Sequence, residues 1–595
     1  MLRNASRAAK SPTNRRLFSH TTFGPSIQAT LRNRRAFVAV SSVISAGSLL
    51  YVFSDRIHND SETPWEKFPP TSSEISSSTH KKDTDEGLHT LVWGSNKTHI
   101  LFPEGQSPES VRTPADAAWL SDVALRDLVL HEKHAACIDA RGDVYQWGEG
   151  FFDSSRAAES TKPLLTLRGK NIIKLQATPS RVFALSASGR IYVLASSVTH
   201  QELSPGAPTP ASTPWWGTGW FWGEEEDIDF AEITPCERLE WKEKFVSIAA
   251  GNDHLIALTS TGRAFTHAIS AQANAYGQLG YRKFDIPDRE AKLPNARRKI
   301  VLTPKSTKDP YAKSTPSVRK ASSVDNVDPE VPLDDSSLEF SDKLFEVPAL
   351  RGIEVSQIAA GSRSSFVKTK AGRVLGWGAN EFGQIGLGSN VTVDTVTVPT
   401  EIILWRSTPQ LMRSTCVDIF AGGDLTFFTV ERVDGTAMPY VDVLACGNGQ
   451  WGGLGNALYT NAQGSPLRAK NVSGLYEYSE KTKNLQPIHT RDISVSPTGH
   501  VLLTLDTLER SGPGGGGRDL IVWGANSEYQ LGNGKRGSLA SPTALHVDDG
   551  ERLLLGKKKA QVNDLSGKVW KKEVEVEQCA VAGFGNSVVY WKICS

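Results

Sequence analysis

Short runs of apolar residues, separated by polar turns that contain glycine, recur along most of this chain. In residues 355–378 the runs VSQIAA, SSFVKT and VLGWG follow one another, with the turn KAGR before the third. Runs this short favour strands over helices, and glycine-containing turns between them are typical of antiparallel sheet. The pattern therefore predicts a protein built mainly from short β-strands.

The same order of runs and turns repeats along the sequence. The segment GWGANEFGQIGLG at 376–388 nearly matches VWGANSEYQLGNG at 522–534. Related units occupy residues 245–280, 355–388, 417–456 and 493–534, and two weaker copies occupy residues 125–150 and 172–196. One such unit cannot bury its own faces, so several units must pack side by side, and a radial arrangement of them is a β-propeller.

The two ends of the chain carry complementary halves of one unit. Residues 88–96 hold only the half with the tryptophan, and residues 576–593 hold only the half that normally comes before it. We therefore expect the N- and C-terminal strands to share one blade. The tryptophan-type halves lie at residues 93, 147, 193, 265, 377, 446 and 523. The predicted fold is all-β: a seven-bladed propeller over residues 88–595, closed by the N- and C-terminal strands.

At this point the units resemble the repeats of the RCC1 (regulator of chromosome condensation) family. Its G-x-V-x-x-WG-x-N-x-x-GQLG-G signature is matched by Gly372, Val374, Trp377, Gly378, Asn380, Gly383, Gln384, Gly386 and Gly388, and again by Trp523, Gly524, Asn526, Gln530, Leu531, Gly532 and Gly534. The resemblance is weak in the first two full units. It implies a seven-bladed propeller with Trp93, Trp147, Trp377, Gly378, Asn380, Trp523, Gly524 and Asn526 as structural residues of the repeat.

The first 35 residues have the composition of a mitochondrial presequence. They contain 8 arginine or lysine residues, no acidic residue, and many Ser, Thr and Ala. This composition is typical of a transit peptide, and the piece RRLFS predicts cleavage at Phe18/Ser19. The alternative interpretation of residues 1–35 is a disordered basic arm.

Residues 36–53 are uncharged over 18 positions, about the minimum for a helix that crosses a ~30 Å hydrocarbon core. We predict a transmembrane helix here, followed by a linker over residues 54–87. The arginines before the helix favour a matrix N-terminus and a propeller in the intermembrane space, with a matrix-facing propeller as an alternative. The rival to a single-pass mitochondrial inner-membrane protein is a type II anchor of the secretory pathway. That alternative would give a role to the sequons at Asn4, Asn59, Asn96, Asn390 and Asn471.

Two insertions interrupt the repeats. The first, about residues 198–243, contains the cluster Trp215, Trp216, Trp220, Phe221 and Trp222, followed by an acidic run from Glu224. Such a density of aromatic side chains must be covered, either by folding back on the propeller as a cap or by a partner. The partner-binding hypothesis is a docking patch for a protein or for the membrane interface, and the acidic neighbours favour a basic protein partner.

The second insertion, about residues 281–345, starts with a basic segment and ends with an acidic one. Pro, Ser, Lys and Asp dominate its composition. We predict a largely disordered loop, because so few apolar side chains cannot offset the entropy of ordering the segment.

The composition narrows the possible chemistry. The net charge is +1 with 22% charged residues, whereas a dedicated nucleic-acid surface usually needs a strong basic excess, so no nucleic-acid partner is predicted. None of the 6 cysteines forms a CxxC pair and none of the 13 histidines belongs to an HExxH motif, so we predict no metal site. No cofactor and no catalytic group are predicted either. His254, within GNDHLIAL, is expected to have a structural role at a blade turn.

The segment GNGQWG, residues 447–452, matches the glycine pattern G-x-G-x-x-G and follows a predicted strand. A dinucleotide-binding loop also needs a helix next and an acidic residue about 20 positions further on. No convincing helix pattern follows, and the glycines are in register with those of the other units. We therefore interpret this segment as a turn of the repeat, where glycine permits tight backbone geometry.

Three functions fit the sequence. The first is a non-catalytic scaffold, anchored through residues 36–53, whose protein partners are inner-membrane respiratory-complex subunits. The resemblance to fungal mitochondrial RCC1-like proteins implies a role in respiratory-complex biogenesis, of which the cytochrome bc1 complex is the candidate. The second is guanine-nucleotide exchange on a small GTPase, the activity that the family resemblance implies. The third is an enzyme with an unrecognised site on the propeller axis.

Overall fold

A computed structural model of the chain describes residues 87–103, 108–152, 162–201, 230–287, 297–308, 342–405, 408–409, 412–435, 438–479, 482–507, 517–547 and 550–594. All of these residues lie in one compact unit, Asp85–Ser595. The predicted presequence, the predicted transmembrane helix over 36–53 and nearly all of the predicted linker lie outside the described residues. Within the described ranges, we find no helix long and apolar enough to cross a membrane.

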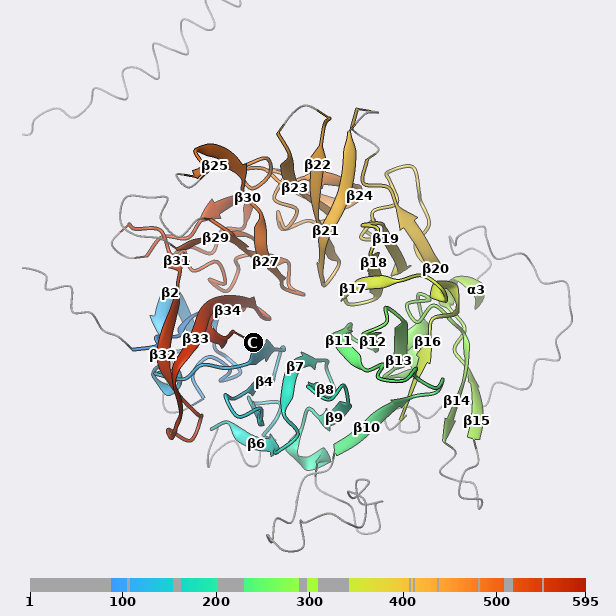
Figure 1. Ribbon diagram of the computed structural model, residues 1–595, viewed down its shortest axis with the longest axis horizontal. Coiled ribbons are helices and arrows are strands. Elements are labelled where there is room, and N and C mark those ends of the chain that lie inside the picture. Colours follow the sequence, from blue (N-terminus) through green and yellow to red (C-terminus); the bar gives the residue numbers. More distant parts are fainter. Residues whose placement is uncertain are drawn as a thin grey trace, which may run out of the picture. The chain divides into compact units, whose positions relative to one another are not determined.

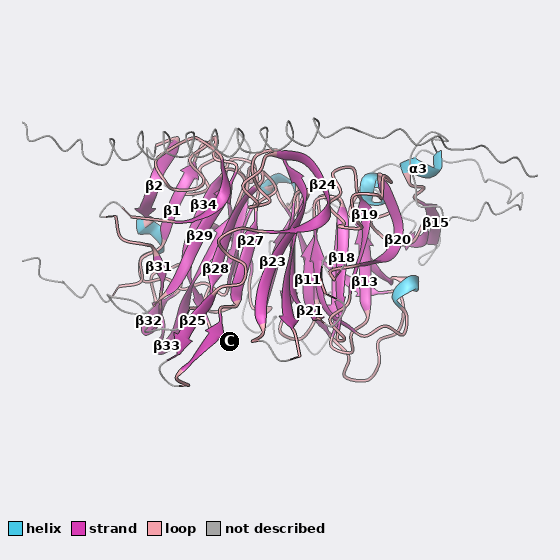
Figure 2. Cartoon of the chain, turned by 90° about the horizontal axis from the view of Figure 1, so that it is seen from above, coloured by secondary structure: helices cyan, strands magenta, loops and turns pink. Residues whose placement is uncertain are grey.

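The described unit is an all-β propeller (Figure 1). Antiparallel sheets are arranged radially, as the repeated strand pattern predicts. Three of the sheets follow chain order: β3 (Asp127–Leu130), β4 (Ala135–Ile138), β5 (Val144–Trp147), β6 (Leu164–Leu167); β17 (Val355–Ala360), β18 (Ser364–Thr369), β19 (Val374–Ala379), β20 (Thr395–Ile402); and β21 (Arg413–Gly422), β22 (Leu425–Val433), β23 (Tyr440–Gly449), β24 (Thr460–Arg468). Viewed from the side, labelled strands of the last two of these sheets, such as β18 and β23, stand next to one another (Figure 2).

Two further sheets have extra strands. One consists of β27 (Thr490–Val495), β28 (His500–Leu505), β29 (Arg518–Gly524) and β30 (Leu539–Ala544), with β31 (Leu554–Leu555) paired to β29. The other joins the chain ends in the order β2 (Ser110–Asp116), β1 (Leu91–Ser95), β34 (Asn586–Ile593), β33 (Val569–Ala582), β32 (Lys557–Asn563). In the second sheet Trp93 of β1 pairs with Ser587 of β34, so the N- and C-terminal strands share one sheet, as the complementary half-units predict.

The remaining large sheet differs from the sequence prediction because it contains eight strands. Its order is β11 (Phe245–Ala250), β12 (His254–Thr259), β13 (Ala264–Ala268), β16 (Lys343–Glu346), β10 (Phe230–Pro235), β9 (Ile191–Ala195), β8 (Arg181–Ser186), β7 (Ile172–Ala177). The cause is a parallel contact between two outer strands, in which Thr234 pairs with Lys343 and Pro235 with Leu344. The described propeller thus has five separate blade-like sheets and one eight-stranded sheet, rather than seven separate sheets.

Both predicted insertions overlap strands of the propeller. Strand β10 lies inside the first insertion as bounded from the sequence, and β16 lies inside the second. The second insertion also contains a hairpin of β14 (Lys283–Pro287) and β15 (Arg297–Val301), then the short helix α3 (Lys305–Lys308). Phe284 and Ile300 of this hairpin pack in a buried apolar cluster with Leu279. The prediction of a largely disordered loop was therefore wrong for these parts, because a few apolar side chains suffice to dock a hairpin on the blade.

The other elements are short. They are the two-stranded sheet of β25 (Tyr476–Ser479) and β26 (Asn484–Pro487), and the 3-10 turns η1 (Ala118–Leu120), η2 (Val198–His200), η3 (Ala271–Asn274) and η4 (Pro348–Leu350). The core lies between the sheets. Strands β8, β12 and β28, each second from the axis, are buried along their whole length, as expected of a strand covered on both faces by neighbouring blades.

Candidate interaction surface

Four tryptophans lock neighbouring sheets together. Each is almost completely buried, and its indole N–H reaches a loop of the adjacent sheet. The indole N–H groups of Trp93, Trp147, Trp377 and Trp523 donate hydrogen bonds of 2.8, 2.9, 2.8 and 2.8 Å to the carbonyls of Gln530, Ile100, Gln278 and Gly453, respectively. A buried indole usually has such a partner for its N–H, so these bonds fix loops of the adjacent sheets.

Buried hydroxyl groups support the same loops. Ser365 Oγ donates to the carbonyl of Gln278 at 2.8 Å and lies 3.0 Å from His254 Nε2. The same arrangement recurs with Ser587, Gln530 and His500, at 2.8 and 3.1 Å. Burial lowers the pKa of His254 to about 4 and that of His500 to about 3, which keeps both rings neutral at physiological pH.

The loops have a recurring backbone geometry, which depends on two residue types of the repeat. Asn380 Oδ1 accepts a hydrogen bond from the backbone N–H of Ile385 at 3.2 Å, and Asn526 Oδ1 accepts from Leu531 at 3.0 Å. Gly378 and Gly524 have φ values of +109° and +99°. A Cβ on Gly378 would lie 2.5 Å from the carbonyl oxygen of Arg363, so only glycine fits this crossing of the hairpin.

The tryptophan position is not filled by tryptophan in every sheet. By strand pairing, Trp377 lies opposite Ser365, the second residue of its neighbouring strand. The corresponding residues elsewhere are Leu194, His267 and Cys446. The predicted positions of two of these halves, residues 193 and 265, are slightly out of register, because short apolar runs without the WG pair do not fix their own alignment.

The hairpin turns between inner and second strands surround the mouth of a central channel of about 240 Å³. Seven inner strands contribute to its lining, namely β3, β7, β11, β17, β21, β27 and β33. Phe584, at one of these turns, lies 4.7 Å from the ring of His131, which stacks on His134 at 4.8 Å. Burial lowers the pKa of His131 to about 4. The mouth therefore carries the apolar ring of Phe584 and the neutral imidazole of His131.

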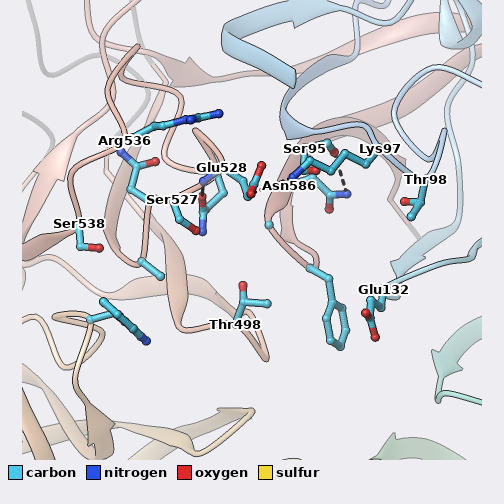
Figure 3. A pocket seen from close by; sticks show the side chains of 16 residues that line it. Ser95, Lys97, Thr98, Glu132, Thr498, Ser527, Glu528, Arg536, Ser538 and Asn586 are labelled. Carbon is cyan, nitrogen blue, oxygen red and sulfur yellow. Dashed lines mark hydrogen bonds and ion pairs between the residues drawn. The ribbon is translucent and has the colours of Figure 1, made fainter. Parts of the chain in front are cut away.

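A larger cleft of about 580 Å³ adjoins the channel mouth and shares Phe584 with it. Figure 3 shows Arg536 on one side and Lys97 on the other, with Glu528 between them. Lys97 Nζ forms an ion pair of 3.1 Å with Glu528. The apolar wall includes Trp451, whose side chain is 54% exposed. An exposed tryptophan beside charged groups is a common feature of protein-binding surfaces.

A second charged network lies on neighbouring hairpin turns. The guanidinium of Arg363 contacts Glu381 at 2.7 Å and Asp424 at 3.4 Å, and its carbon atom lies 4.6 Å from the ring centre of Tyr276. Burial acts to lower the pKa of Arg363, but Asp424 and Glu381 more than offset this effect and raise it. Gln384 Nε2 also donates to Asp424, at 3.3 Å. These side chains form ion pairs and hydrogen bonds with one another, so their positions in this network are fixed before any partner binds.

The predicted partner-binding residues Trp215, Trp216, Trp220, Phe221 and Trp222 lie outside the described residues. Their sequence signal therefore remains a prediction. The exposed Trp451 and the cleft beside it were not predicted, because GNGQWG was considered only as a nucleotide-binding motif or a turn. The sequence signal that could have indicated this surface is the tryptophan next to a turn glycine, Trp451 before Gly452.

The residues of GNGQWG form the end of β23 and the turn after it. Gly447 and Gly452 have φ values of +113° and +80°, and the next described element is the strand β24. These glycines serve backbone turns of the repeat. In the described part of the chain, no group of three or more His, Cys, Asp or Glu side chains is placed to hold a metal ion.

Comparison with known proteins identifies the repeat. A family model described as "Regulator of chromosome condensation (RCC1) repeat" matches residues 371–429, and a second model with that description matches residues 355–384. The structure titled "Crystal structure of Kap60 bound to yeast RCC1 (Prp20)" aligns with a TM-score of 0.50 and 16% identity, over 85% of this chain and 89% of that chain. This likeness supports the propeller fold.

Two curated proteins are similar in sequence. "Protein FMP25, mitochondrial" of Saccharomyces cerevisiae is 22% identical over 508 residues, which are 84% of this chain and 72% of that protein. The "Secretion-regulating guanine nucleotide exchange factor" of Bos taurus is 30% identical over 158 residues, which are 25% of this chain and 29% of that protein. The first similarity extends over most of the propeller, and the second over only part of it.

Proposed function

Because the chain is an RCC1-repeat protein with an all-β propeller fold, we propose that it acts as a non-catalytic interaction scaffold in mitochondria. The observation that carries this proposal is the face that surrounds the channel mouth. There the cleft of about 580 Å³ combines the exposed Trp451 with the ion pair of Lys97 and Glu528 and with Arg536, on a backbone fixed by the repeat. Rigid loops with an exposed aromatic anchor are suited to binding another protein.

The proposed location rests on two sequence observations. The first 35 residues have the composition of a transit peptide, and the similar yeast protein is described as mitochondrial. We further propose that residues 36–53 anchor the chain in the inner membrane, with the propeller in the intermembrane space. The partners would then be subunits of an inner-membrane respiratory complex, such as the cytochrome bc1 complex, during its assembly.

We propose that the aromatic cluster of the first insertion contributes a second contact. Strand β10 starts at Phe230, a few residues after this cluster, and pairs in parallel with β16, which starts at the end of the second insertion. The pairing is reinforced by a bond of 2.6 Å from Lys343 Nζ to Thr234 Oγ1. The ends of both insertions therefore meet at one edge of the propeller, which supports a shared role for them.

We also propose that the eight-stranded sheet represents two blades joined edge to edge. Its strands form two antiparallel groups of four, and the only strand pairing between the groups is the parallel contact of β10 and β16. Counted in this way the propeller has seven blades, in agreement with the seven inner strands that line the channel.

Native gels of inner-membrane complexes from cells with and without this chain test the proposed function. We expect one complex to stall as a subassembly while the others are unchanged. A uniform loss of all complexes would indicate a general defect of the membrane, and unchanged complexes would contradict the scaffold.

The second candidate function is guanine-nucleotide exchange on a small GTPase. The similarity to a protein described as a guanine nucleotide exchange factor favours it. Purified full-length chain would then accelerate release of a fluorescent guanine nucleotide from a mitochondrial small GTPase. An unchanged release rate at saturating chain would contradict this candidate.

A further inference from the structure

Tyr529 breaks a backbone rule that two equivalent loops obey. The residue before the loop glutamine has positive φ in all three loops: +82° at Gly277, +73° at Gly383 and +62° at Tyr529. Positive φ suits glycine and strains a bulky aromatic residue. Backbone strain that persists is concentrated at sites where the side chain itself has a function.

The two arginines next to Tyr529 lie against its ring. The guanidinium carbon of Arg536 is 4.7 Å from the ring centre, and that of Arg112 is 5.6 Å from it. Both arginine side chains are exposed. Among the described residues, neither guanidinium forms an ion pair with a carboxylate. The ring of Tyr529 thus lies close to two cationic groups.

The backbone around these side chains is fixed by buried hydrogen bonds. Asn526 Nδ2 donates to the carbonyl of Lys535 at 2.7 Å and to that of Gly537 at 3.2 Å, on either side of Arg536. The backbone N–H of Gly534 donates to the carbonyl of Arg112 at 3.1 Å. The loop of Arg536 is therefore attached to the strand of Arg112, and little entropy is lost when both arginines bind one ligand.

We infer that Arg112, Tyr529 and Arg536 form an anion-recognition site for an acidic, apolar-flanked segment of a partner protein. Guanidinium groups bind carboxylates in a planar, two-bonded geometry, and the aromatic ring keeps both groups in place. Arg536 also lines the cleft that contains Trp451 and Phe584, so an acidic side chain on the arginines would set a neighbouring apolar side chain into this cleft. This inference rests on the proposed scaffold function and names the chemistry of its partner.

Fluorescence anisotropy with the purified full-length chain tests the site. The probe is a fluorescein-labelled peptide of alternating Glu and Leu, and the control probe alternates Lys and Leu. We expect the acidic peptide to bind and the basic peptide not to bind. Arg112→Gln and Arg536→Gln should each weaken binding about tenfold, the loss of roughly one charge-assisted hydrogen bond.

Tyr529→Gly separates recognition from folding. The substitution removes the strained φ and should raise the melting temperature. It should also weaken binding of the acidic peptide about tenfold, as the arginine substitutions do. Arg413→Gln, the loss of an exposed arginine at the first residue of β21, is the matched control and should change neither property. If Tyr529 only fills space, its replacement leaves peptide affinity unchanged, and that result overturns the inference.

Two further outcomes also decide against the site. Equal affinity of the wild type and both arginine variants overturns it, as does binding to vesicles of anionic phospholipid without binding to the peptide. If the peptide fails to bind while cells lacking the chain still stall one inner-membrane complex, the anion site is wrong and the scaffold function stands.

Discussion

The loops at residues 380–388 and 526–534 occupy equivalent places in the repeat, and the residue before the shared glutamine is glycine in the first and tyrosine in the second. In the first loop Gly383 packs directly on the backbone of Gly464, and a Cβ would collide with it. In the second loop the equivalent Tyr529 keeps positive φ, and its ring contacts two arginines. The same backbone thus serves close packing in one loop and presents a side chain in the other.

The two loops also differ in the buried side chains that donate hydrogen bonds to their glutamine carbonyls. The carbonyl of Gln384 accepts from Thr426 Oγ1 at 2.8 Å and from Cys446 Sγ at 3.3 Å. The carbonyl of Gln530 accepts instead from the indole of Trp93 and from Ser587, which His500 contacts. The loop of Gln530 therefore has the more extensive buried support of the two, and it shares this tryptophan, serine and histidine arrangement with the loop of Gln278.

The largest expected effect is at the tryptophan behind the second loop. Trp93→Ala should lower the free energy of unfolding by about 3–5 kcal/mol, because it leaves a cavity and removes one of the two hydrogen bonds to the carbonyl of Gln530. Urea unfolding followed by fluorescence measures this change. Cys446→Ala, at the same position behind the first loop, is the control and should cost about 1 kcal/mol. Equal effects would remove the distinction between the two loops.

The next effect concerns the first loop itself. Gly383→Ala should destabilise the chain by about 2–3 kcal/mol, since the new Cβ adds strain at positive φ and collides with Gly464. Thermal unfolding is a sufficient measurement. Gly567→Ala isolates the φ strain as a control, because Gly567 has a φ of +78° with open space around its Cβ position. A Gly383 variant no worse than this control would show that the close packing is unimportant.

Asn526→Ala should destabilise the chain by about 1–3 kcal/mol through loss of buried hydrogen bonds. Because Asn526 fixes the carbonyls beside Arg536, the variant should also bind the acidic peptide more weakly. Asn380→Ala should have a similar cost in stability and no effect on the peptide. Urea unfolding and fluorescence anisotropy on both variants make this comparison. An equal loss of peptide affinity in the two variants would contradict it.

The histidine behind the second loop predicts a pH dependence. Burial lowers the pKa of His500 to about 3 in the folded chain from an unfolded value near 6.5. Its stabilising contribution is therefore complete above pH 6.5 and is lost as the pH falls below that value, by at most about 1.4 kcal/mol per pH unit. His500→Gln should reduce the slope of stability against pH in this range. An unchanged slope would show that His500 does not remain neutral.

Tyr529→Gly has the smallest expected effect on folding and the opposite sign. Release of the strained φ should stabilise the chain by about 1 kcal/mol, partly offset by lost contacts of the ring. Differential scanning calorimetry beside the wild type detects it. A marked loss of stability would mean that the ring is a packing residue.

The fold was predictable as far as local pattern determines it. Glycine turns and short apolar runs predicted the all-β propeller, and the incomplete units at both ends predicted that β1 and β34 pair. The pairing of β10 with β16 could not be predicted, since it joins residues more than 100 positions apart whose short runs carry no register signal. The same limit applied to the hairpin of β14 and β15, which depends on packing with Leu279.

The candidate site was less predictable than the fold. The repeat residues indicated where the loops are, but Arg112 and Tyr529 meet only because the closing sheet brings the two chain ends together. In the sequence, the tyrosine in YQLG was visible as a departure from GQIG, yet nothing local showed that two arginines would flank it. The predicted aromatic cluster of the first insertion remains a prediction.

The most direct test of the account replaces the wild-type chain in cells by the Tyr529→Gly variant and examines inner-membrane complexes on native gels. We predict that the variant accumulates to the wild-type level, because its fold is not weakened, while one complex stalls as it does without the chain. Full assembly with the variant would contradict the claim that this loop is kept strained in order to bind a partner.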